Sequence, residues 1–103
     1  MPNSNYLAGR RTEYQRMKYW KSQHHDVLRT AGSHGFADLI TISDRGEVYF
    51  IQVKRCQTKA QAERLIAQFK ARPPLGDRYH ARYFQMIEVS VKDLRGEVLS
   101  GWV

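Results

Sequence analysis

The sequence predicts a single α/β domain with a mixed sheet flanked by helices. Two stretches have helical periodicity, three short apolar runs lie between them, and a fourth apolar run follows the second stretch. The chain of 103 residues has the length of one domain, spanning residues 1–103, and 42% hydrophobic residues suffice for a modest core. The expected order is α-β-β-β-α-β, with a short additional strand at residues 97–103.

The first helix is expected over residues 6–23. Glu13, Met17 and Trp20 recur there at positions i, i+4 and i+7, which places them on one stripe. Most surface helices keep carboxylates off the apolar stripe. Glu13 therefore either lies at the edge of the core or points toward a functional group.

Three strands are expected next, at residues 26–30, 36–42 and 48–53. Residues 31–35 contain two glycines and predict a loop, and residues 43–47 have the composition of a turn. The second and third strands are apolar at neighbouring as well as alternate positions, which is typical of a sheet covered on both faces. We expect these three strands to form a meander.

The second helix is expected to begin after Thr58, whose side chain can cap it. Its apolar stripe comprises Ala62, Leu65, Ile66 and Phe69. Pro73 and Pro74 end it. A fourth strand is expected at residues 82–91, followed by a turn at 93–96.

The composition is strongly basic. Seventeen Lys and Arg residues outnumber ten Asp and Glu residues, giving a net charge of +7. This balance favours a nucleic-acid partner, although a basic protein need not bind one. Residues 1–30 hold six of the basic and only two of the acidic residues, so this segment is expected to make the first contact with phosphates.

The cysteine and histidine content limits the chemistry. Cys56 is the single cysteine, so no internal disulfide can form, and a partly buried structural thiol is expected. His24 and His25 are adjacent and would diverge on a helix, so no zinc site is expected. Without a membrane-length apolar run or a signal-peptide segment, we expect no membrane partner and a cytoplasmic location, nucleoid-associated or in the host cytoplasm if phage-encoded.

The hairpin of the second and third strands predicts a polar cluster. If the turn is centred on Arg45, Asp38 lies opposite Gln52, with Cβ atoms about 4.5–5.5 Å apart. Lys54 points to the same face at the diagonal position. Glu13 joins this cluster if the first helix packs across that face.

Such a cluster suits metal-dependent phosphodiester hydrolysis. Magnesium prefers oxygen ligands and needs only one or two carboxylates. Asp38, the Gln52 side chain and the Val53 carbonyl supply oxygens, and Glu13 binds the metal directly or through water. Lys54 would orient the attacking water and offset charge on the phosphate. The alternative is a solvated strand edge or an ordinary ion pair.

The same residues resemble a known motif. Glu13, Gly35-Phe36-Ala37-Asp38 and Ile51-Gln52-Val53-Lys54 follow the order and spacing of PD-(D/E)xK nucleases. More closely, residues 6–91 resemble the archaeal-type Holliday junction resolvases and their phage-borne relatives. Residues 9–13 are similar to that family's glycine-basic-glutamate segment, residues 27–33 to its second element, and residues 61–66 to the helix after its catalytic strand.

The resemblance implies a restriction-endonuclease-like fold and a homodimer with two active sites. It implies Mg²⁺-dependent nicking of opposed strands in four-way DNA junctions, with Mn²⁺ substituting, in DNA recombination and repair. The implied site consists of Glu13, Asp38, Gln52 and Lys54, with Ser33 on a mobile loop near the scissile phosphate and Gln61 in support.

Two residues depart from the family pattern. Ala37 replaces the usual proline, which is a backbone detail. Gln52 replaces the usual acid, and a neutral amide binds Mg²⁺ less strongly than a carboxylate. Two alternatives therefore stay open: a nuclease acting on flaps, forks or duplex DNA, and a catalytically silent junction-binding protein.

Several basic residues are candidates for DNA contacts. Arg10 and Arg11 adjoin Glu13, and Arg29, Arg55 and Lys59 bracket the expected site. His34, beside Ser33, can reach a phosphate, although an exposed loop histidine is favoured. For Arg16, Lys18 and Lys21, a solvated helix face is equally expected. The aromatic residues, Trp102 included, are expected in the core or at a dimer interface.

Overall fold

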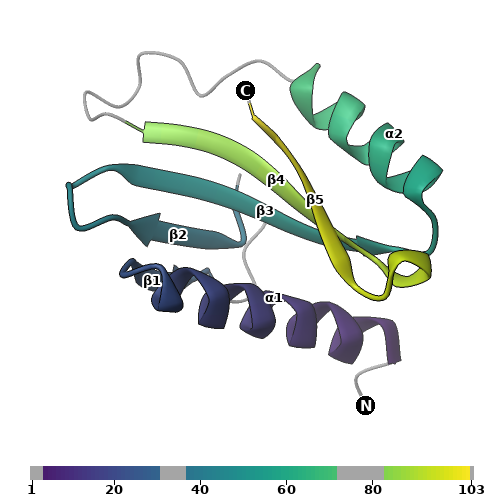
Figure 1. Ribbon diagram of the computed structural model, residues 1–103, viewed down its shortest axis with the longest axis horizontal. Coiled ribbons are helices and arrows are strands. Elements are labelled where there is room, and N and C mark those ends of the chain that lie inside the picture. Colours follow the sequence, from purple (N-terminus) through teal and green to yellow (C-terminus); the bar gives the residue numbers. More distant parts are fainter. Residues whose placement is uncertain (1–3, 31–36, 72–82, 103) are drawn as a thin grey trace.

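The structure, a computed structural model, describes residues 4–30, 37–71 and 83–102. The elements in these ranges are α1 (Ser4–Ser22), β1 (Asp26–Arg29), β2 (Leu39–Ile42), β3 (Val48–Cys56), α2 (Lys59–Lys70), β4 (Tyr83–Val91), the 3₁₀-helix η2 (Lys92–Leu94) and β5 (Glu97–Trp102). Figure 1 shows α1 on one face of the sheet and α2 on the other. The predicted mixed α/β order, with its additional C-terminal strand, is confirmed.

The five described strands form one sheet in the order β1-β2-β3-β4-β5. All neighbours are antiparallel except β3 and β4, which are parallel and are joined through α2. The predicted meander of β1, β2 and β3 is therefore confirmed. Leu39 lies opposite Ile51, and Ile42 lies opposite Val48, which is the register expected for a turn centred on Arg45.

The α1 face of the sheet holds one of two core clusters. Its buried members are Leu39, Ile51, Val53 and Met86, and Met17, Trp20 and Tyr49 pack against them. The predicted stripe of α1 thus packs on the core. Because side chains alternate along a strand, residues 38, 52 and 54 belong to the opposite face.

The α2 face holds the second cluster, formed by Ala62, Phe69, Ile87, Val89 and Val91. Thr58 caps α2 as predicted: its hydroxyl accepts a hydrogen bond from the Gln61 N–H, and the Gln61 side chain binds the Thr58 N–H in return. Cys56 packs beside this cluster, which confirms the partly buried thiol, and burial raises its pKa.

Three strand boundaries differ from the sequence prediction. β1 ends at Arg29, one residue before its predicted end. β3 continues to Cys56, three residues past the predicted end, because its backbone pairs with β4 as far as Val91. Backbone pairing does not depend on side-chain polarity, so the exposed Lys54 and Arg55 do not end the strand. β2 begins at Leu39; the start predicted for it at residue 36 lies outside the described residues.

A buried ion pair joins α1 to β4. Glu88 is only 3% exposed, and its carboxylate accepts hydrogen bonds from Arg16 Nε at 3.0 Å and Arg16 Nη2 at 2.6 Å. Trp20 Nε1 donates a third at 3.1 Å. Arg16 therefore neither lies on a solvated helix face nor is available to phosphate. The bonds between Arg16 and Glu88 fix the position of α1 on the sheet.

None of the helices in the described ranges combines the length and the apolar character that crossing a bilayer requires.

Candidate functional site

Asp38 lies directly before β2 and is bonded to β3 through both backbone and side chain. Its N–H donates to the Ile51 carbonyl at 2.9 Å, and its Oδ2 accepts from the Val53 N–H at 2.8 Å. The regular pairing of β2 with β3 ends at Leu39 and Ile51, so the carboxylate takes the place of a strand partner for Val53. This bond fixes the orientation of the carboxylate.

The backbone carbonyl of Val53 lies on the same edge of β3. The N–H and C=O of one strand residue point to the same side of the strand. Ile51 directs its C=O, and Val53 its N–H, toward Asp38. The Val53 carbonyl is therefore directed to the edge that carries the Asp38 carboxylate. The carbonyl and the carboxylate supply two of the oxygens predicted as metal ligands.

Gln52 and Lys54 project from the α2 face. Cys56 has the same parity along β3 and packs against the α2 cluster, which identifies the face. The β2–β3 register ends at Leu39 and Ile51, and the Asp38 N–H bonds the Ile51 carbonyl, so the predicted pairing of Asp38 with Gln52 lies beyond the regular register. Lys54 is exposed and Gln52 is half-buried. The structure thus joins Asp38 to Val53, and Gln52 and Lys54 are the neighbours of Val53 along β3; their convergence with Asp38 stays a prediction.

Glu13 lies on the other face. α1 packs against the side of the sheet that presents Leu39 and Ile51, so it does not cross the face of Gln52 and Lys54. Glu13 Oε2 instead accepts a hydrogen bond from Arg29 Nε at 3.1 Å, in an ion pair with side chains 19% and 16% exposed, respectively. Glu13 was expected to join the cluster if α1 packed across the face of Asp38 and Gln52. Because α1 covers the opposite face, this condition is not met.

The predicted DNA-binding residues Arg10, Arg11, Arg29, Arg55 and Lys59 divide into two groups. Arg29 pairs with Glu13, and its guanidinium lies 5.2 Å from the Tyr14 ring centroid. Arg10 Nη2 reaches the Tyr14 hydroxyl at 3.5 Å, and this hydrogen bond lowers the pKa of Tyr14. These two arginines have partners within the protein. Arg11, Arg55 and Lys59 form the second group; they are exposed, as Arg10 is, and take part in neither of the two ion pairs of the described residues.

Three further predicted residues have different outcomes. Gln61 Oε1 accepts hydrogen bonds from the N–H groups of Gln57 and Thr58, so this oxygen serves the start of α2. Its supporting role for the site stays a prediction. Ser33 and His34 lie outside the described residues.

Glu88 was missed by the sequence reasoning. It occurs in an otherwise apolar run, Met86-Ile87-Glu88-Val89, and a lone carboxylate in such a run signals a buried partner. The sequence does not identify that partner, because Arg16 is 72 residues away.

The donor set of the hairpin fits magnesium better than zinc. Across the described ranges, no three His, Cys, Asp or Glu side chains gather into a metal-binding group. The hairpin offers one carboxylate, one amide and one backbone carbonyl, all oxygen donors. Mg²⁺ keeps several waters and is held by one or two carboxylates with other oxygens, so these residues fit it.

Comparison with protein-family models finds none that matches the chain, and comparison with curated proteins finds no matching relative. The resemblance to the junction resolvases therefore depends on the quoted sequence motifs alone.

Proposed function

We propose that the chain is a magnesium-dependent endonuclease that cuts branched DNA, acting on four-way junctions as a homodimer. The observation that carries this proposal is the hydrogen bond of 2.8 Å from the Val53 N–H to the Asp38 carboxylate. The Val53 carbonyl is directed to the same edge of β3 as this N–H. Both oxygens lie where the pairing of β2 with β3 ends, and the exposed Lys54 follows Val53 along β3.

Each residue has a distinct role in this proposal. Asp38, the Val53 carbonyl and the Gln52 amide oxygen would hold Mg²⁺, which when bound neutralises phosphate charge and acidifies water. The hydrogen bond from Val53 holds the carboxylate in place before substrate arrives, so little reorganisation is needed. Lys54 places an ammonium group beside the phosphate and orients the attacking water.

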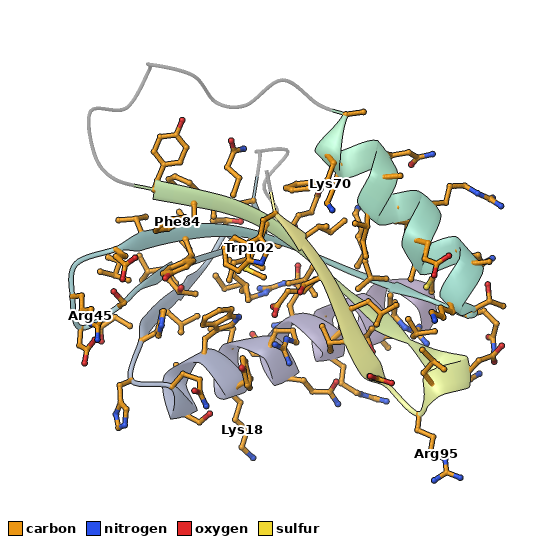
Figure 2. The ribbon with its side chains drawn as sticks, turned by 45° about the horizontal axis from the view of Figure 1, so that its top comes forward. Lys18, Arg45, Lys70, Phe84, Arg95 and Trp102 are labelled. Atoms are coloured by element: carbon orange, nitrogen blue, oxygen red, sulfur yellow. The ribbon has the colours of Figure 1, made fainter. Side chains whose placement is uncertain are left out.

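Dimerisation and the DNA substrate have support of other kinds. The net charge of +7 suits a phosphate-rich partner, and binding should weaken steeply with salt. Phe84 and Trp102 are 38% and 46% exposed and have ring centroids 6.2 Å apart (Figure 2). This aromatic pair is suited to burial against a second copy, and a two-fold dimer would present two sites to one junction.

A junction-binding protein without cleavage is the second candidate. Gln52 brings no charge to the site, and the Glu13 carboxylate is already paired with Arg29. One carboxylate at the hairpin is the minimum that Mg²⁺ uses. The two candidates differ in cleavage and agree in binding.

The test is cleavage of a labelled four-way junction, with matched flap, fork and duplex substrates, in Mg²⁺, Mn²⁺ or EDTA. Paired nicks in the junction alone, lost in EDTA, are expected. Equal cutting of duplex would refute junction specificity, and junction binding without cutting would favour the second candidate.

Two variants locate the site. Asp38→Asn should abolish cleavage and leave junction binding near normal, whereas Asp44→Asn, which alters an exposed turn carboxylate, should leave both unchanged. Lys54→Met should reduce cleavage, and Lys18→Met is its control, since Lys18 points away from the sheet (Figure 2). Cleavage by Asp38→Asn at the wild-type rate would place the metal elsewhere.

A further inference from the structure

A pocket of about 280 Å³ lies on the α1 side of the sheet, away from the hairpin cluster. The first half of α1 forms one wall, through residues such as Arg11 and Gln15. The carboxyl end of β3 contributes Arg55, and the η2 turn between β4 and β5 contributes Lys92 and Arg95. Three separate parts of the chain thus bring four basic side chains to one hollow.

No ion pair among the described residues balances the charges of this pocket. The described residues that line it include no Asp or Glu. The two ion pairs of the described residues use Arg16 and Arg29, and neither involves Arg11, Arg55, Lys92 or Arg95. Asp93, next to Lys92, is bound by the Gln57 amide at 2.6 Å. Four like charges around one hollow repel each other, so an anion that enters relieves the repulsion.

Arg95 occupies a backbone position that normally favours glycine. Its φ is +57°, in the left-handed region, where a side chain is strained. Its exposed side chain extends outward from the turn (Figure 2), and the residue is one of those that line the pocket. Replacement by glycine would remove the charge and also relieve the backbone, which makes this position an informative test.

A second hollow, of about 330 Å³, adjoins the first. The two share Arg55 and Cys56, and the second adds Arg64, Gln61 and Gln68 from α2. Basic surface therefore runs from α1 past the end of β3 to α2. Two adjoining hollows suit a chain of phosphates better than a single small anion, because one polymer can occupy both.

We infer that these hollows form an anchoring site for the sugar-phosphate backbone of nucleic acid, distinct from the Asp38 cluster. Arg55 follows Lys54 directly, and strand alternation sends the two side chains to opposite faces. A DNA strand anchored at Arg55 would thus lie one residue along β3 from Lys54, on the opposite face from the Asp38 cluster. This inference deepens the proposed function and rests on it.

The test measures binding of a labelled four-way junction in EDTA, at several salt concentrations, by fluorescence anisotropy. The double variant Arg55→Gln/Arg95→Gly should bind at least tenfold more weakly. Its slope of log affinity against log salt should fall by about 2, since each lost phosphate contact contributes about 0.9. The control Lys18→Gln/Lys21→Gln removes the same charge from exposed positions of α1 outside the pocket lining and should retain the wild-type slope.

Two further measurements separate the outcomes. The double variant should unfold at no lower urea concentration than wild type, because Arg55 is exposed and Arg95→Gly relieves the backbone, so its binding loss cannot come from misfolding. Inorganic phosphate should compete only at millimolar concentration; tight binding of phosphate alone would identify a small-anion site and overturn the inference. If wild type neither binds nor cuts the junction, the proposed function fails. If it binds and the double variant is unchanged, the anchoring site alone fails.

Discussion

Replacing Glu88 by alanine removes the carboxylate that joins α1 to β4. The side chain is 4% exposed and accepts three hydrogen bonds, two from Arg16 and one from Trp20. After truncation, the Arg16 guanidinium and the Trp20 N–H stay in place without their acceptor. Removing one partner of a buried ion pair costs about 3–5 kcal/mol, mostly because the other charge stays uncompensated.

The geometry favours the lower end of that range. The Arg16 side chain is 15% exposed, so part of its charge can reach water after the change. We therefore expect Glu88→Ala to lower the free energy of unfolding by about 3 kcal/mol. Domains of this size have about 5–15 kcal/mol in total, so the loss is a large share. The melting temperature should fall by about 12 °C or more.

Urea unfolding followed by tryptophan fluorescence measures this change, with Trp20 at the perturbed contact. Glu88→Gln should lie between wild type and Glu88→Ala, because the amide oxygen can still accept from Trp20. The double variant Arg16→Met/Glu88→Leu should recover much of the loss, since it leaves no buried charge. A loss of unfolding free energy below about 1 kcal/mol for Glu88→Ala would refute the reasoning. So would a double variant whose loss equals the sum of the losses of Arg16→Met and Glu88→Leu measured separately.

Three other predictions test separate parts of the fold. Gly101→Ala should cost about 1–3 kcal/mol, because the new Cβ would lie 2.5 Å from Ile66 Cγ2, and Ile66→Ala should partly rescue it in urea unfolding. Cys56 should react slowly with iodoacetamide at about pH 7.5 and faster as the pH rises past about 9, because burial raises its pKa and so lowers the thiolate fraction. Mass spectrometry measures the labelling, and fast labelling of the folded protein would contradict this prediction. The double variant Phe84→Lys/Trp102→Lys should convert a dimer to a monomer in light scattering, whereas a monomeric wild type would contradict the dimer proposal.

Local sequence signals determined much of the architecture. Thr58 and Gln61 lie three residues apart, so the cap at the start of α2 depends on neighbouring residues and can be predicted from the sequence. The turn centred on Arg45 set the register of β2 against β3, because a hairpin of fixed loop length leaves one pairing that buries the apolar face. The same register was the basis for predicting Asp38, Gln52 and Lys54 at one end of the hairpin, although the regular pairing ends at Leu39 and Ile51.

Only the tertiary structure decided the features that depend on distant segments. The sequence showed Glu13 on the packed stripe of α1. Tertiary packing decides which face of the sheet α1 covers, and it pairs Glu13 with Arg29. Glu88 and Arg16 meet across 72 residues, and Arg11, Arg55 and Arg95 line one pocket from three segments. Periodicity along the chain defines which side of an element is apolar; which charges then face each other depends on how the elements are packed together.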